Sequence, residues 1–193
     1  MKEFENDYIL RNKFITLVHD VGIRSVCETG TEFGGTSNSF AYMKPVQSVL
    51  TIDLEQKFTD PLHPNVRFIQ GDTRDKLPQA LDEILNNKLF PVLFFLDAHP
   101  GVFGAFGPLA DEIKIIAAFF ALHTDLPLPW IAIHDCEVPG KPFGFDTYHD
   151  GPISWVTHKA NIESIYPKGC KVTYNEEAVG AARGCLFVEP CNL

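Results

Sequence analysis

The sequence lacks the long apolar runs, the paired cysteines and the excess of basic residues that mark several large classes of protein. Its longest apolar stretches, residues 91–96 and 113–122, fall well short of the roughly 20 residues that span a bilayer. Five cysteines at irregular spacing form no C-x-x-C pair, which favours free thiols over a disulfide framework. The first residues do not follow the basic-then-apolar order of a secretory signal. We therefore predict a cytoplasmic protein without a membrane-embedded segment.

Positive charge is also scarce. The chain has 25 acidic and 16 basic residues, and its formal net charge is -9 at pH 7. Such a chain repels a phosphate backbone, and no basic run or aromatic RNA-binding motif offsets this repulsion, which argues against a general nucleic-acid binder. A length of 193 residues with 45% hydrophobic residues is typical of one globular domain. We treat residues 1–193 as a single domain, with an N-terminal helix within 1–22 and an α/β core over 23–193.

Short β-rich apolar runs alternate with helical patterns along the chain. The predicted strands are residues 25–28, 48–53, 66–69, 92–96, 130–133, 170–174 and 185–188. The predicted helices begin at residue 8 and end at Gly22, run from the 30–37 turn to before Pro45, and cover 75–85, 110–122 and 153–165. This alternation predicts an α/β fold with a doubly wound, mostly parallel seven-stranded sheet. The last two strands resemble a hairpin, so we expect an antiparallel edge strand.

Ligands of such sheets bind beyond the carboxyl ends of the strands, and the first strand ends in a glycine-rich turn. Residues 28–37 read Glu-Thr-Gly-Thr-Glu-Phe-Gly-Gly-Thr-Ser. Glycines allow a ligand to approach the backbone, and the helix that follows favours a carboxylate or phosphate at its first turn. The spacing Glu-x-Gly-x-x-x-Gly differs from the Gly-x-Gly-x-x-Gly of nicotinamide-binding folds. A plain strand-to-helix turn without a ligand is the alternative.

The next two strand ends are acidic as well. Asp53 lies about one βα unit past the glycine turn, where a carboxylate can bind both hydroxyls of a ribose. Asp72 follows the third strand and could accept a hydrogen bond from an adenine amino group. The segment 72–75 is equally typical of a helix N-cap.

Asp97 and Asp135 end the fourth and fifth strands. Parallel neighbours place these two carboxylates side by side, where they repel each other unless a partner offsets their charge. A magnesium ion would remove that cost, while one raised pKa or exposure to solvent are the alternatives. His99 and His134 lie at the same strand ends and titrate near neutrality. We predict His99 as a general base and keep His134 as a second catalytic candidate, although strand alternation could point it the other way.

Two loops rich in glycine and aromatic residues, 101–107 and 138–151, could cover an apolar or planar ligand. Two ordinary flexible loops are the alternative.

Together these pieces resemble a class I S-adenosylmethionine-dependent methyltransferase over residues 25–188. The matching pieces are the turn Glu28-x-Gly30-x-x-x-Gly34, Asp53, Gly71-Asp72, Asp97 and Asp135. The segments 96–99, 108–113 and 133–135 are similar to small-molecule O-methyltransferases of the group that includes cephalosporin hydroxylase and sugar O-methyltransferases. The resemblance implies a Rossmann-like methyltransferase fold.

The resemblance also implies roles for individual residues. It implies that S-adenosylmethionine is bound by Glu28, Thr29, Gly30, Gly34, Gly35, Thr36, Ser37, Asp53, Leu54, Asp72, Thr73 and Asp97. For Mg²⁺ it implies Asp97 and Asp135 as ligands. Metal-dependent members carry Asp or Asn where this chain has Cys136, a poor magnesium ligand, so the resemblance implies Glu137 as the third ligand in its place. Pro100 occupies the place of the lysine base of catechol-type members, which weakens the case for catechol chemistry.

We therefore predict transfer of a methyl group from S-adenosylmethionine to a small-molecule acceptor, at a hydroxyl. The alternatives are a nicotinamide-dependent oxidoreductase, a non-catalytic nucleotide-binding domain of the same fold, and a metal-dependent hydrolase or hydroxylase that uses Asp97 and Asp135. The identity of the acceptor and the oligomeric state stay open, with a homodimer among the possibilities.

Overall fold

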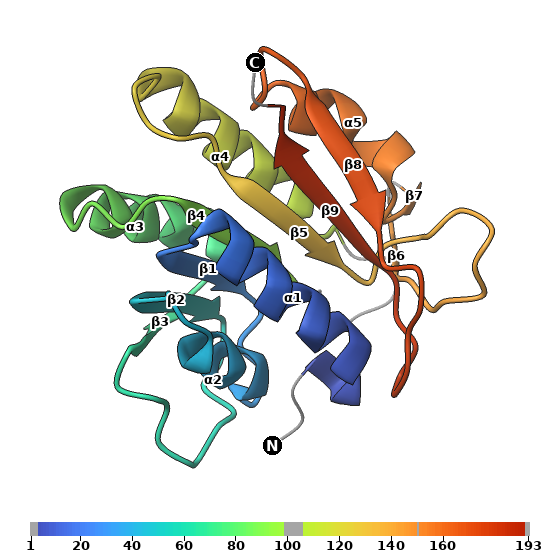
Figure 1. The fold of residues 1–193 in the computed structure, drawn as a ribbon, viewed down its shortest axis with the longest axis horizontal. Helices are drawn as coiled ribbons and strands as arrows, with labels where there is room; N and C mark the ends of the chain where they lie inside the picture. Colours follow the sequence, from blue (N-terminus) through green and yellow to red (C-terminus); the bar gives the residue numbers. More distant parts are fainter. Residues whose placement is uncertain (1–3, 99–105, 150, 192–193) are drawn as a thin grey trace.

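The protein is built around a seven-stranded sheet with the strand order β3-β2-β1-β4-β5-β9-β8 (Figure 1). The computed structural model describes residues 4–98, 106–149 and 151–191. The sheet strands are β1 (Ser25–Thr29), β2 (Ser48–Asp53), β3 (Val66–Gln70), β4 (Val92–Leu96), β5 (Trp130–His134), β8 (Cys170–Tyr174) and β9 (Cys185–Pro190). The remaining elements are η1 (Phe4–Asn6), α1 (Tyr8–Val21), α2 (Gly35–Tyr42), α3 (Thr73–Asn86), α4 (Leu109–Leu122), α5 (Trp155–Glu163) and the short hairpin of β6 (Thr147–Tyr148) and β7 (Gly151–Pro152).

The sheet is mostly parallel, as the sequence predicts. β1 pairs in parallel with both β2 and β4, and β4 pairs in parallel with β5. β9 runs antiparallel to β5 and to the edge strand β8, so the predicted antiparallel edge pairing is confirmed. The strand order reverses between β1 and β4. This switch point is where ligands of open α/β sheets bind.

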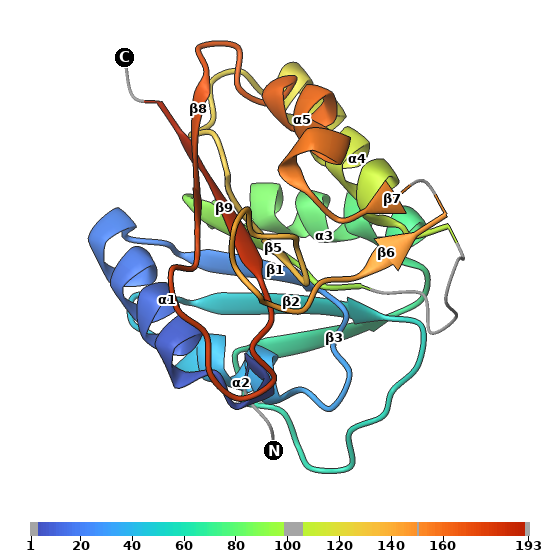
Figure 2. The same cartoon turned by 90° about the vertical axis from the view of Figure 1, so that its right-hand side faces the viewer.

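Two helical layers enclose the sheet, with α1 and α2 on one face and α3, α4 and α5 on the other (Figures 1 and 2). Successive strand residues face opposite layers, so Val26 packs in the cluster of α1 and α2, whereas Cys27 packs in that of α3 and α4. Burying one large apolar side chain contributes roughly 1.5–3 kcal/mol to folding. The two apolar clusters therefore hold the strands, and with them the strand ends, in a fixed register.

An aromatic cluster ties the N-terminal turn η1 to the sheet. The rings of Phe4, Phe14, Phe40 and Phe95 lie with centroids 5.1 to 6.0 Å apart. Phe4 is almost fully buried, although it lies outside every predicted element. Its neighbour Glu5 is thereby carried to the carboxyl end of the sheet.

The helix ends follow their capping residues. Asp7 accepts hydrogen bonds of 2.9 Å from the N–H groups of Ile9 and Leu10 at the start of α1, and Gly22 ends this helix in a left-handed conformation. α3 begins two residues earlier than predicted, because Asp72 caps it. Pro78 therefore lies in the second turn of α3. The last helix, predicted over 153–165, is shorter and begins after its cap Ser154.

Two further observations concern the cysteines and the helices of the described residues. All five cysteines are free. Among the helices of the described ranges, none is both long enough and apolar enough to cross a bilayer.

Candidate functional site

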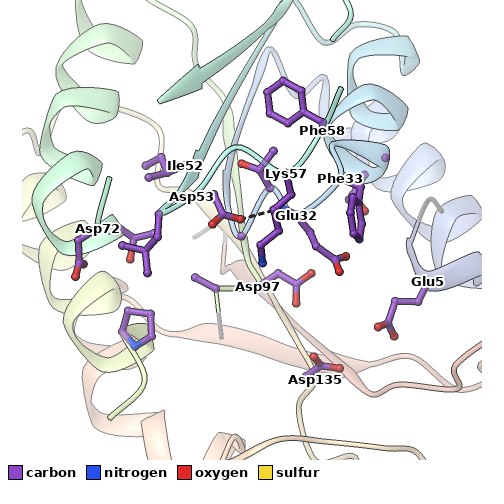
Figure 3. Close-up of a pocket in the computed structure, with 18 of the residues that line it drawn as sticks. Glu5, Glu32, Phe33, Ile52, Asp53, Lys57, Phe58, Asp72, Asp97 and Asp135 are labelled. Carbon is purple, nitrogen blue, oxygen red and sulfur yellow. Dashed lines mark hydrogen bonds between the residues drawn. The ribbon is translucent and has the colours of Figure 1, made fainter. Parts of the chain in front are cut away.

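A cavity of about 1020 Å³ opens at the carboxyl ends of the parallel strands (Figure 3). Residues at the carboxyl ends of β1, β2, β3, β4 and β5 all contribute to its lining, namely Gly30, Asp53, Asp72, Asp97 and Asp135. Figure 3 shows Glu5, Asp97 and Asp135 toward one end and Asp72 toward the other. The structure therefore brings together residues that are separated by more than a hundred positions in the sequence.

The glycine turn after β1 owes its shape to close packing at the switch point. Gly30 has a φ of 86°, and a Cβ atom there would collide with the backbone oxygen of Asp97. Gly34 has a φ of 74° and precedes α2, and its Cβ would lie 2.5 Å from Leu62. Only glycine meets both requirements at these positions. The turn thus brings the start of α2 to the cavity, where Gly35 and Thr36 line the wall.

Glu28 supports this turn from behind rather than lining the cavity. One carboxylate oxygen, Oε2, accepts hydrogen bonds from Ser37 and, at 2.5 Å, from Thr51. Among the described residues, no group donates a hydrogen bond to the other oxygen, Oε1. The side chain is fully buried, and this burial raises the pKa of Glu28 from 4.5 to about 8. Glu28 therefore lies in a buried polar network that fixes the start of α2 against β1 and β2.

The predicted cofactor residues divide into two groups. Those that line the cavity are Gly30, Gly35, Thr36, Asp53, Leu54, Asp72, Thr73 and Asp97. Those outside its lining are Glu28, Thr29, Gly34 and Ser37. The second group shapes the wall that the first group presents.

Asp53 lies at the centre of the cavity wall. Its Oδ2 accepts a hydrogen bond of 2.9 Å from the N–H of Glu32 (Figure 3). Its Oδ1 accepts one of 3.2 Å from the N–H of Glu55. An ionised carboxylate has about four acceptor sites, so each oxygen can accept another donor. Asp53 is thus both oriented by the backbone and able to bind the hydroxyls of a ligand.

Asp72 is largely committed to its own helix. Its carboxylate accepts hydrogen bonds from the backbone N–H of Arg74 at 2.9 Å and from the Arg74 guanidinium at 2.9 and 2.6 Å. These hydrogen bonds lower the pKa of Asp72. These contacts therefore show Asp72 as the N-cap of α3, which is the alternative to contact with a ligand.

Thr73, the next residue, offers a clearer sign of a ligand. It lines the cavity, only 5% of its surface is exposed, and its Oγ1 has no hydrogen-bond partner among the described residues. A buried hydroxyl without a partner is costly. A ligand group at this position would remove that cost.

The ends of β4 and β5 form a compact charged cluster. The Nδ1 atom of His134 lies 3.0 Å from Oδ1 of Asp97 and 3.5 Å from Oδ1 of Asp135. Arg183, from the turn before β9, donates hydrogen bonds to Asp135 and to Asp146. The two carboxylates that the sequence places side by side are therefore bridged by the protein's own side chains.

A left-handed residue explains why His134 and Asp135 meet. Strand alternation would send these neighbours to opposite faces of the sheet, but Asp135 has a φ of 52° and ends the strand abruptly. Burial alone would lower the pKa of His134. The carboxylates of Asp97 and Asp135 outweigh burial and raise it from 6.5 to about 9. His134 is therefore held as an imidazolium at neutral pH.

Other predicted residues are less central. Glu137 is exposed and does not line the cavity, and burial raises the pKa of the Cys136 thiol to about 12. Among the described residues, the acids and histidines whose ligand atoms lie within 4.8 Å of one another are instead Glu5, His134 and Asp135. His99, the predicted base, lies outside the described residues.

The two predicted covering loops meet near the cavity. Residues 101–105 of the first loop lie outside the described residues, and residues 138–149 of the second loop are described. The ring of Phe106 stacks on His149 with centroids 4.4 Å apart, and Phe106 lines the cavity. Tyr148 donates a hydrogen bond of 3.2 Å to the carbonyl of Ala98, just past β4. These contacts join the two loops beside Asp97.

Three parts of the site were not predicted from the sequence. They are Glu5 on η1, residues 57–60 in the loop after β2, and Arg183. The unusual length of the connection between Asp53 and Val66 is a signal that could have found the loop, because long connections are often functional. No local pattern identifies Glu5 or Arg183, since tertiary packing alone brings them to the strand ends.

Acidic side chains dominate the cavity. Seven of the lining residues are Asp or Glu, and two are Lys or Arg. The cavity therefore favours a ligand that carries positive charge.

Comparisons with known proteins give a consistent account of the fold. No protein-family model matches the sequence, and no curated protein matches it. Among solved structures, a caffeoyl-CoA O-methyltransferase-like protein from Staphylococcus aureus superposes with a TM-score of 0.52 at 13% identity, over 94% of this chain and 83% of that one. Human N-acetylserotonin methyltransferase in complex with S-adenosylmethionine superposes with a TM-score of 0.55 at 15% identity, over 95% of this chain and 52% of that one.

The chain has the class I methyltransferase fold. This fold accounts for the seven-stranded order and for the single antiparallel strand β9. The methyltransferase-like sheet places its switch point at Gly30 and Asp97, on the wall of the cavity. The fold by itself does not establish the reaction, which has to be argued from the residues that line this cavity.

Proposed function

We propose that the chain is an S-adenosylmethionine-dependent methyltransferase that acts on a hydroxyl of a small molecule. The observation that carries this proposal is one acid-rich cavity at the switch point that joins the glycine turn, Asp53 and the unpartnered hydroxyl of Thr73. Each of these features suits a different part of the same cofactor.

The lining fits S-adenosylmethionine part by part. Asp53 would accept hydrogen bonds from the ribose hydroxyls, and Thr73 would pair with a polar atom of the adenine. The first-turn N–H groups of α2, at Gly35 and Thr36, would bind the carboxylate of the methionine part. The cofactor also carries an ammonium and a sulfonium group, so its net positive charge suits the surplus of acids in the cavity.

The same lining disfavours a nicotinamide dinucleotide. That cofactor carries a pyrophosphate, which seven acidic lining residues against two basic ones would repel. The turn also lacks the Gly-x-Gly-x-x-Gly spacing that brings a pyrophosphate to a helix N-terminus. The oxidoreductase alternative is therefore the weaker one.

Methyl transfer needs alignment and a place for one proton. The cofactor, when bound, supplies an electrophilic methyl group, and the protein must hold the acceptor oxygen in line with it. The acceptor hydroxyl must also lose its proton to a base. His134 is held protonated by Asp97 and Asp135, so we assign it the role of a counter-ion for these carboxylates. His99 stays the predicted base.

The predicted magnesium site is the part that the residues fit least well. Glu137 does not line the cavity, and Arg183 binds Asp135. Asp97 is hydrogen-bonded to His134. These contacts use carboxylate oxygens that a metal ion would need, so we route no step of the reaction through a metal.

A calorimetric titration with S-adenosylmethionine tests the proposal. Asp53→Ala removes the two charge-assisted hydrogen bonds to the ribose, each worth about 1.5–3 kcal/mol. We therefore expect the dissociation constant to rise by about 100-fold or more. The matched control is Glu55→Ala, because Glu55 lies two residues further along and does not line the cavity. Equal affinities of Asp53→Ala and the wild type would overturn the assignment of the ribose site.

A further inference from the structure

The acid pair at the ends of β4 and β5 has positive partners built into the chain. Arg183 bridges Asp135 to Asp146, and the ring of His134 lies between Asp97 and Asp135. The sequence alone suggested that a divalent cation would separate the two acids. In the structure, a guanidinium and an imidazole ring lie where that charge is needed.

The guanidinium is held in place by two interlocked loops. The N–H of Gly144 donates to the carbonyl of Ala182, and the N–H of Gly184 donates to the carbonyl of Gly144, both at 2.9 Å. A Cβ atom at Gly144 would lie 2.9 Å from the guanidinium nitrogen of Arg183, so this glycine makes room for it. The side chains of Arg183 and Asp135 are 24% and 9% exposed. Arg183 is thus part of a packed arrangement rather than a loose surface side chain.

A metal ion would have to compete with this arrangement for the same oxygens. Magnesium and manganese bind carboxylate oxygens, and Oδ1 of Asp135 already accepts from Arg183. The neighbouring set of Glu5, His134 and Asp135 has ligand atoms within 4.8 Å of one another, but it includes the same Asp135. Displacing Arg183 would also leave a partly buried guanidinium without one of its two carboxylates, which is costly.

We propose that Arg183 takes the place of the divalent cation at this strand end, so that the site works without a bound metal. Arg183 does not line the cavity. It is therefore a positioning residue that acts through Asp135, whose carboxylate it binds. The proposal rests on the proposed methyltransferase function for its catalytic meaning, but the charge arrangement can be tested by itself.

The test is a titration of the full-length protein with Mn²⁺ alone, in which electron paramagnetic resonance counts the free ion. The wild type is expected to show no saturable site with a dissociation constant below about 1 mM. One tight Mn²⁺ per chain in the wild type that is lost in Asp135→Asn would overturn the proposal.

A substitution of Arg183 provides the complementary result. Arg183→Gln removes the positive charge and leaves Glu5, Asp97 and Asp135 close together, so we expect its Mn²⁺ affinity to rise at least tenfold. The matched control is Arg67→Gln, which breaks an ion pair to Glu83 on the surface and is expected to gain nothing. A folded Arg183→Gln without any gain would contradict the proposal. If this variant does not fold, the wild-type titration decides alone.

Binding of S-adenosylmethionine separates this proposal from the proposed function. Calorimetry of the wild type in EDTA and in excess Mg²⁺ is expected to give the same affinity within twofold. Absence of cofactor binding under both conditions would defeat the proposed function and leave the Mn²⁺ result intact. Binding that appears only with Mg²⁺ would defeat the metal-free site.

Discussion

At the scale of single residues, Glu28 shows how the site depends on a buried carboxyl group that keeps its proton. Its raised pKa, about 8 in the folded chain against 4.5 in an unfolded one, means that the native state keeps a proton which the unfolded state releases. The stability that this proton contributes is complete below pH 4.5 and is lost as the pH rises to about 8. Between these pH values the free energy of unfolding falls by at most about 1.4 kcal/mol for each pH unit.

Glu28→Gln should remove this dependence on pH. The variant carries a neutral side chain of the same shape, so its free energy of unfolding should fall less than that of the wild type between pH 4.5 and 8. Urea unfolding at a series of pH values measures the difference. Glu137→Gln, at an exposed position, serves as the control and should follow the wild type. Parallel curves for Glu28→Gln and the wild type would show that Glu28 is ionised in the fold.

Gly30 is the residue at which the switch point leaves no room for a side chain. Gly30→Ala combines an unfavourable positive φ with a collision against the backbone of Asp97, so we expect it to lower the free energy of unfolding by about 3 kcal/mol or more. Gly140→Ala is a matched control, because its φ is 75° and a Cβ there meets nothing within 4 Å. That variant should lose only about 1 kcal/mol. Equal losses in the two variants would mean that the positive φ, and not the close approach of Asp97, is what requires a glycine at this position.

At the scale of elements, α3 contains a proline in its interior, where proline lowers the stability of a helix most. Pro78 cannot donate the hydrogen bond to the carbonyl of Arg74 that a helix makes at this position, and it is exposed. Pro78→Ala should restore this bond and raise the free energy of unfolding by about 1–2 kcal/mol, less than the full helix penalty because the unfolded chain gains freedom. Thermal unfolding compares it with Gln79→Ala, which should change little. A loss of stability in Pro78→Ala would indicate that the ring makes a packing contact.

The elements themselves were largely predictable from the sequence. β2, β4 and β8 have the predicted bounds, because apolar runs between turn residues determine buried strands. The start of α3 was missed because an N-cap and a ligand-binding acid are the same residue type, here Asp72. The meeting of His134 with Asp135 could not be predicted, since it depends on one left-handed residue.

The site was predictable only where it lies on strand ends. Asp53, Asp97 and Asp135 line the cavity because each ends or directly follows a parallel strand. Residues 57–60 reach the cavity through tertiary packing, in which Leu62 covers Gly34 and the N–H of His63 donates to Asn38. Sequence periodicity carries no information about such contacts.

At the scale of the whole molecule, charge and topology point to the same ligand. The net charge of -9 is reflected in the cavity, where acids outnumber bases, and the sheet places this cavity at its switch point. A cationic adenosyl ligand is favoured there over an anionic dinucleotide. Binding should weaken as salt screens these exposed charges.

The most direct test of the account is the thermal unfolding midpoint of the full chain with S-adenosylmethionine or with NAD⁺ at equal concentrations. A ligand at 100 times its dissociation constant stabilises the native state by about 2.7 kcal/mol, which corresponds to about 5–10 °C for a chain of this size. The account predicts such a rise with S-adenosylmethionine and none with NAD⁺. A rise with NAD⁺ alone, or with neither ligand, would contradict it.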